Sequence, residues 1–158
     1  MSEEKQYLTS EKLQEFKKEL VYLKTEKRKQ VAENLEYTKK LGDLSENAEY
    51  HDARQIQGEV EDRINHLENL LKRAVVLDEN ASGAKEGIVS IGSSVKVLKE
   101  GDKDARDYKI VGSEESDMAQ GKVSNLSPLG AALIGKKKGD KVTVQTPKGK
   151  IVYTLISF

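Results

Sequence analysis

Two stripes of apolar residues at helical spacing, separated by one short polar segment, run through residues 1–78. Spacings of three and four residues are typical of the seam between packed helices. This half has no proline, and its only glycines are Gly42 and Gly58. Two helices joined by one tight turn must run antiparallel, so the pattern predicts a coiled-coil hairpin about 45 Å long. The stripes are Leu13, Phe16, Leu20, Leu23, Val31 and Leu35, and then Ala53, Ile56, Val60, Ile64, Leu67, Leu71 and Ala74.

Local signals mark the start of the first helix and an interruption in its stripe. Thr9 fits the N-cap position, and Leu8 and Leu13 fit the hydrophobic staple that often accompanies such a cap. The stripe breaks at Lys27 and resumes at Val31. We therefore expect the first helix to begin directly after Thr9.

The sequence changes character near residue 80, where glycine becomes frequent and the segments shorten. Ten of the twelve glycines follow this point, and β-branched residues alternate with polar ones over five short segments. This alternation predicts β-strands, and KEGDKD and TPKGK fit hairpin turns. Ser127, Pro128 and Gly135 mark the start and end of one short helix. The predicted fold class is α+β, with a helical hairpin over residues 1–78 and a small β-sheet domain over residues 79–158.

Composition excludes several classes of function. The 158 residues include 27 basic and 27 acidic side chains, so net charge gives no reason to expect sequence-independent binding to duplex nucleic acid. The absence of cysteine excludes disulfides, thiolate metal sites and a thiol nucleophile. No apolar run approaches the roughly 18 residues that a membrane span needs. We therefore expect a soluble, cytoplasmic protein that does not associate with membranes.

The segment GDLSENAEYHDAR lies at the turn between the predicted helices and concentrates ionisable groups at the tip of the hairpin. Asp43 and Glu46 fit the N-cap and N3 positions of a capping box, and Gly42 fits the residue that ends the preceding helix. Two carboxylates about one turn apart could instead share a divalent cation. Because Mg²⁺ prefers six oxygen ligands, the tip alone should bind it weakly. Both interpretations are compatible with this segment.

The surroundings of the two acids argue against a purely capping role. Glu49 and Asp52 add negative charge that capping does not require. The nearby cations are suited to phosphates, and the tip is far from the second domain. If the tip entered an active site that already held one Mg²⁺, its carboxylates could complete a second site and orient a water. The cations on the adjoining turns are Lys39, Lys40, His51 and Arg54.

GDLSENAEYHDAR, which follows a Lys/Glu-rich helix and precedes QIQGEVEDRI, closely resembles the tip signature of the bacterial transcript cleavage factors, the Gre family. The resemblance continues in the same order through GIVSIGSSVKVL, YKIVGSEESD and SPLGAALIGKKKGDKVTV, and covers nearly the whole chain. It is nearest to the GreA type, because the hairpin carries only a small cluster of basic residues. The resemblance implies an FKBP-like fold for the C-terminal domain.

The resemblance also implies a mechanism. Factors of this family bind bacterial RNA polymerase, insert the hairpin through its secondary channel and stimulate its Mg²⁺-dependent cleavage of backtracked nascent RNA. Asp43 and Glu46 would be the catalytic acids and would hold Mg²⁺ jointly with the polymerase. The isolated protein would bind no cofactor tightly. The other tip residues that the resemblance implies are Lys39 and Arg54, for contact with the RNA 3′ end, and Asn47 and Tyr50, for support of the tip.

The C-terminal domain would dock on the polymerase through the SPLG turn and the preceding SEESD loop. The docking residues implied are Ser127, Pro128, Leu129 and Asp117. Leu129 could equally pack the short helix on the sheet.

We expect a monomer that stimulates the polymerase and is not an autonomous nuclease. Two alternatives are a channel-binding inhibitor of transcription with the same architecture and a coiled-coil adaptor or chaperone that uses the sides of the hairpin.

Overall fold

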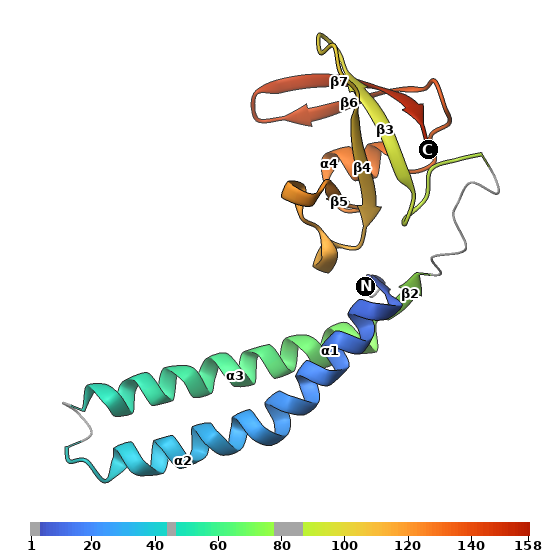
Figure 1. Ribbon diagram of the computed structural model, residues 1–158. Helices are drawn as coiled ribbons and strands as arrows, with labels where there is room; N and C mark the ends of the chain where they lie inside the picture. Colours follow the sequence, from blue (N-terminus) through green and yellow to red (C-terminus); the bar gives the residue numbers. More distant parts are fainter. Residues whose placement is uncertain (1–3, 44–46, 78–86) are drawn as a thin grey trace. The chain divides into compact units, whose positions relative to one another are not determined.

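The structure, a computed structural model, describes residues 4–43, 47–77 and 87–158 (Figure 1). These residues form two compact units. One unit, Leu13–Arg73, contains most of the helical hairpin, and the other contains the remaining described residues. Within the described parts of the chain, no helix is both long and apolar enough to cross a bilayer.

The helical hairpin has the two arms that the apolar stripes predict (Figure 1). The first arm consists of α1 (Ser10–Tyr22), a π-helical turn η1 (Leu23–Lys27) and α2 (Arg28–Lys39). The second arm is α3 (Ala48–Lys72). The π-helical turn lies at the interruption of the first stripe, because its wider i→i+5 bonding shifts the residues that follow around the helix. The predicted hairpin is therefore confirmed, with an irregularity at the predicted break.

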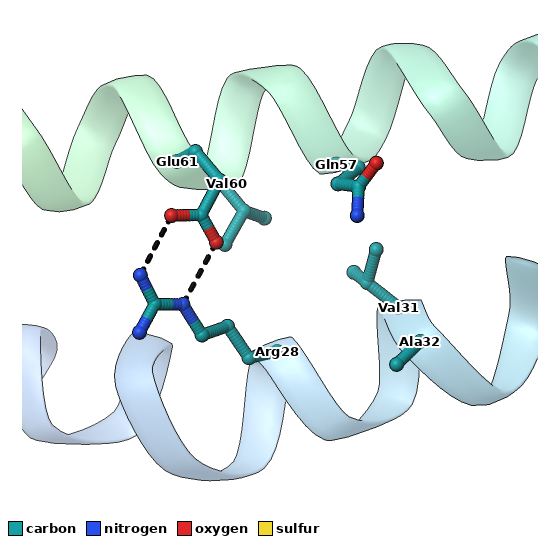
Figure 2. Close-up of a pocket in the computed structure, with 6 residues that line it drawn as sticks. All are labelled: Arg28, Val31, Ala32, Gln57, Val60 and Glu61. Atoms are coloured by element: carbon teal, nitrogen blue, oxygen red, sulfur yellow. Dashed lines mark hydrogen bonds and ion pairs between the residues drawn. The ribbon is translucent and has the colours of Figure 1, made fainter.

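The seam between the arms differs from the predicted stripe at two positions of α3: Ile56 is exposed, and Leu70 is the fully buried residue where the stripe had Leu71. Ala74, the last residue of the stripe, lies beyond the end of α3. Ile56 is 40% exposed, so its placement in the seam is wrong. Its neighbour Gln57 faces the first arm and lines a hollow of about 230 Å³ beside Arg28 and Glu61 (Figure 2). Using residue 57 gives spacings of 4, 3, 4 and 3 from Ala53, which alternate as a coiled-coil seam requires. The buried residues of α3 are Ala53, Val60, Ile64, Leu67 and Leu70.

Ion pairs between described residues join the two arms. The Arg28 guanidinium donates to both carboxylate oxygens of Glu61, from Nε at 2.7 Å and from Nη2 at 2.6 Å (Figure 2). This hydrogen bonding holds the pKa of the Glu61 carboxyl below its ordinary value. Lys24 also pairs with Glu68, and Arg63 with Glu19.

Two short strands that the sequence did not predict occur at the ends of the hairpin. β1 (Gln6–Thr9) and β2 (Ala74–Leu77) pair in parallel, and Leu8 of β1 is fully buried. The packing groups both strands with the C-terminal sheet, whereas the sequence division at residue 78 placed them in the first half. The predicted cap of α1 is present, because Thr9 Oγ1 accepts a hydrogen bond of 3.3 Å from the Lys12 amide.

The C-terminal sheet has five strands in the order β5–β4–β3–β7–β6. Neighbouring strands are antiparallel except for β4 and β5, which are parallel. Both predicted hairpins are present, one from β3 to β4 and one from β6 to β7. The strands are β3 (Ser94–Lys99), β4 (Arg106–Val111), β5 (Lys122–Ser124), β6 (Lys141–Thr146) and β7 (Gly149–Ser157).

The short helix α4 (Pro128–Leu133) packs against this sheet, as predicted. Ser127 is its N-cap and accepts a hydrogen bond of 3.1 Å from the Gly130 amide. A Cβ atom on Gly130 would overlap the carbonyl oxygen of Ser124, so only glycine allows the helix to approach β5 this closely. The α+β class is therefore confirmed. The buried core of the sheet consists of Val89, Val95, Val97, Ile110, Leu133, Val142 and Leu155.

Candidate functional site

The tip of the hairpin places an exposed acid between the end of α2 and the start of α3. Asp43 lies on the surface and borders an open hollow of about 380 Å³. Glu46, the second acid of the predicted pair, lies outside the described residues. The structure therefore places one of the two predicted catalytic acids. The other described residues that line the hollow are Leu41, Gly42, Asn47, Ala48 and Glu49.

The side chain of Asn47 fastens the two arms together at the tip. Its Oδ1 accepts a hydrogen bond of 3.0 Å from the Tyr50 amide, which makes Asn47 the N-cap of α3. Its Nδ2 donates a hydrogen bond of 2.7 Å to the backbone carbonyl of Thr38, in the last turn of α2. Thr38 is only 3% exposed, so this second bond is shielded from water. One side chain therefore caps one helix and satisfies a carbonyl of the other.

The position of this cap shows that the N-cap of α3 is Asn47 and not Asp43, whereas Glu46, the other member of the predicted capping box, lies outside the described residues. A cap at Asp43 would start the helix at residue 44, whereas α3 starts at Ala48. Asparagine caps helices as well as aspartate does, and only its amide can also donate to a carbonyl. The sequence signal for the cap was an asparagine directly before a helix-forming run. Capping of α3 therefore does not require Asp43.

Gly42 lies just after the end of α2, close to where the sequence predicts it. Gly42 has a φ of 138°, a backbone conformation that side-chain-bearing residues rarely adopt. It lies two residues beyond the C-cap, Lys40. The glycine thus allows the chain to turn after the helix has ended.

The predicted RNA-contacting cations lie on the helical segments beside the tip. Lys39 is the last residue of α2, and Arg54 is on α3, about 9 Å along the axis from its first residue. Both are exposed, and Arg54 donates a hydrogen bond of 3.2 Å to Gln57 Oε1. Tyr50 lies edge-to-face with His51, with ring centroids 5.9 Å apart. The tip therefore combines an exposed acid with exposed cations on both arms.

The described part of the tip does not hold a complete set of metal ligands. In residues 4–43, 47–77 and 87–158, no three His, Asp, Glu or Cys side chains form a possible ligand group. Asp43 and Glu49 border the same open hollow. Mg²⁺ usually completes its six oxygen ligands with waters and substrate phosphates. The carboxylates of Asp43 and Glu49 would therefore suit a cation only if another molecule provided most of its ligands.

The predicted docking residues lie at the two ends of one edge strand, β5. At one end, Asp117 and Lys122 form an antiparallel bridge, in which each backbone amide donates to the other's carbonyl at 2.9 Å. At the other end, Ser127 Oγ donates a hydrogen bond of 2.7 Å to the Ser124 carbonyl. A strand of three residues spans only about 7 Å between its first and last Cα atoms. The fold therefore brings the two predicted docking segments together.

The individual docking residues differ in exposure. Pro128 and Asp117 are exposed, and Asp117 Oδ1 accepts a hydrogen bond of 3.0 Å from the Ala119 amide. Leu129 is half-buried and packs against the core, as the second interpretation of this residue predicts. The polar residues thus have structural partners in addition to any docking role.

Comparison with known proteins gives matches over both halves of the chain. The family profile described as "Transcription elongation factor, N-terminal" matches residues 6–76, and "Transcription elongation factor, GreA/GreB, C-term" matches residues 84–158. "Transcription elongation factor GreA" of Chloroflexus aurantiacus is 47% identical over 156 residues, covering 99% of this chain and 98% of that protein. The protein of the same name from Bacillus subtilis is 40% identical over 157 residues, with coverage of 99% and 98%. A solved structure described as "Structure of the transcription factor Gfh1" is 24% identical, covers 98% of this chain and 97% of that chain, and has a TM-score of 0.47.

Proposed function

Because the chain belongs to the GreA/GreB family of transcription elongation factors, we propose that it binds bacterial RNA polymerase and stimulates the polymerase's cleavage of backtracked nascent RNA. The observation that carries this proposal is the exposed Asp43 at the end of a long hairpin whose helix cap is a different residue, Asn47. A narrow hairpin with an acid at its tip can deliver a carboxylate into a channel.

In this proposal the tip supplies the missing half of a site that the polymerase holds. A Mg²⁺ ion shared with the polymerase would activate water for attack on the RNA phosphodiester. Asp43 and Glu46 would supply carboxylate oxygens to that ion. Asn47 would keep the two arms from fraying, so that Asp43 enters in a defined position. Lys39 and Arg54 would attract the phosphates of the extruded RNA 3′ end.

The remaining parts of the proposal concern docking and the isolated protein. The surface around β5, with Asp117 and Ser127–Leu129, would bind the polymerase while the tip occupies its channel. The isolated protein, a monomer in the cytoplasm, would have no nuclease activity of its own, because the tip offers too few ligands to hold Mg²⁺ tightly.

A stalled, backtracked transcription complex provides the test. We expect the wild type to accelerate RNA cleavage and Asp43→Asn to reduce this stimulation by about 100-fold, as for other single groups that stabilise charge in a transition state. Binding to polymerase, measured by competition, should be unchanged. Asp52→Asn is the matched control, because it removes an exposed acid from α3 outside the hollow.

Three other results of this assay would each point away from the proposal. Full stimulation by Asp43→Asn would refute the role of the tip. Slowed elongation without cleavage would identify a channel-binding inhibitor. Cleavage of RNA by the protein and Mg²⁺ without polymerase would identify an autonomous nuclease.

A further inference from the structure

The loop that carries Asp117 is fastened to the N-terminal strand β1 through a second acid, Glu115. From this arrangement we propose that Glu115 is a positioning residue of the polymerase-docking surface. This inference rests on the proposed function, since it concerns how well the loop binds polymerase. The sequence places the two partners of the contact, Thr9 and Glu115, 106 positions apart.

Both carboxylate oxygens of Glu115 are used by Thr9. The Thr9 amide donates to Oε2 at 2.9 Å, and the Thr9 hydroxyl donates to Oε1 at 2.8 Å. The hydroxyl oxygen also accepts from the Lys12 amide, at 3.3 Å, which leaves its proton directed at Glu115. Hydrogen bonds to a carboxylate are stronger than those between neutral groups. We call this two-bond contact between Thr9 and Glu115 the clasp.

The segment before Glu115 lies directly against β1. Gly112 is buried, and a Cβ atom there would overlap the backbone carbonyl of Tyr7. Ser113 Oγ donates a hydrogen bond of 3.3 Å to Gln6 Oε1. Because these contacts precede the clasp, the whole 3-10 turn η3 (Ser113–Glu115) is fixed along the strand. Close packing and the clasp therefore act on the same short segment.

The segment after Glu115 leads at once to the docking loop. Asp117 caps a second 3-10 turn, η4 (Met118–Gln120), and its backbone pairs with Lys122 of β5. Met118, directly after it, is 64% exposed. Asp117 lies only two residues from Glu115, so a shift at the clasp must move it. The loop is thus held at one end by β1 and at the other by β5.

This arrangement makes the docking surface depend on the N-terminal strand β1 as well as on β5. Without the clasp, the bridge to Lys122 would still hold one end of the loop, and the sheet core does not include Glu115. We therefore expect the fold to persist while the loop loses its fixed position. The loss should appear in binding to polymerase and not in the chemical step at the hairpin tip.

The test uses full-length variants in the stalled-complex assay, with protein concentration varied. Thr9→Val and Glu115→Gln should each raise the protein concentration needed for half-maximal stimulation about tenfold. This is the loss of affinity expected for one lost hydrogen bond to a charged group. The cleavage rate at saturating protein should equal that of the wild type. Thr9→Ser keeps the hydroxyl and should restore wild-type affinity. Glu100→Gln, which changes an exposed acid of the β3–β4 turn, is the matched control.

A double variant separates positioning from a general loss of structure. If Glu115 acts through the loop, Glu115→Gln combined with Asp117→Asn should bind no more weakly than Asp117→Asn alone. Full additivity of the two losses, or unchanged affinity of Glu115→Gln, would overturn the inference while leaving the proposed function intact. A wild type that does not bind polymerase would overturn both.

Discussion

Replacement of Asn47 by alanine should loosen the tip of the hairpin by about 2 kcal/mol. The change removes the side-chain cap of α3, which contributes about 1 kcal/mol in typical helices. It also removes the 2.7 Å hydrogen bond to the Thr38 carbonyl, for which a net contribution of about 1 kcal/mol is typical. Asn47→Ser keeps a capping oxygen but has no amide, so it should lose only the second contribution.

Hydrogen exchange of the His51 amide measures this difference, because its acceptor is the backbone carbonyl of residue 47, at 3.2 Å, which every variant retains. Losses of about 2 and 1 kcal/mol should raise the exchange rate about 30-fold and fivefold, respectively. Stimulation of RNA cleavage should fall in the same order. Equal exchange rates in Asn47→Ala and Asn47→Ser would refute the contribution of the bond to Thr38.

Two further predictions concern the arms and the sheet. Hydrogen bonds from Arg28 and Lys24 hold the pKa values of Glu61 and Glu68 below the ordinary value of about 4.3. The stability that these two ion pairs contribute is complete above the ordinary pKa and is lost as pH falls through the lowered pKa. The urea midpoint of the hairpin should therefore drop below pH 4. The drop should be smaller in Glu61→Gln. In the sheet unit, Gly130→Ala should destabilise the fold by about 1–3 kcal/mol because its Cβ would overlap the Ser124 carbonyl. Gly58→Ala, on an open helical surface, should instead stabilise the hairpin by about 1 kcal/mol, and chemical denaturation of both variants tests the contrast.

The parts of the fold that depend on local periodicity could be predicted from the sequence. The hairpin, the two β-turns and the cap of α4 each follow from residues close together in the chain. The pairing of β1 with β2 could not be predicted, because each strand has four residues and their partners are 68 positions apart. The choice between Ile56 and Gln57 was ambiguous, since steps of three and four residues from Ala53 both fit a helix.

At the candidate site, too, local patterns could be predicted from the sequence and contacts between distant residues could not. Composition and spacing indicated an acidic tip, and the residues that border the hollow include Asp43 as predicted. The capping residue was misplaced by four positions, because Asp43 and Asn47 are equally good caps and only the contact with Thr38 distinguishes them. The clasp of Glu115 on Thr9 had no sequence signal, since a long-range hydrogen bond leaves no periodic pattern.

Because Asn47 caps α3, the residue that supports the helix differs from Asp43, the residue proposed to act in RNA cleavage. The cap of α3 is the side chain of Asn47, so the start of that helix does not rest on the Asp43 carboxylate. Asp43→Asn should therefore reduce stimulated cleavage about 100-fold without changing the exchange of the His51 amide, whereas Asn47→Ala should change both. Faster exchange in Asp43→Asn would show that the acid also supports the fold of the tip, and the separation would then be wrong.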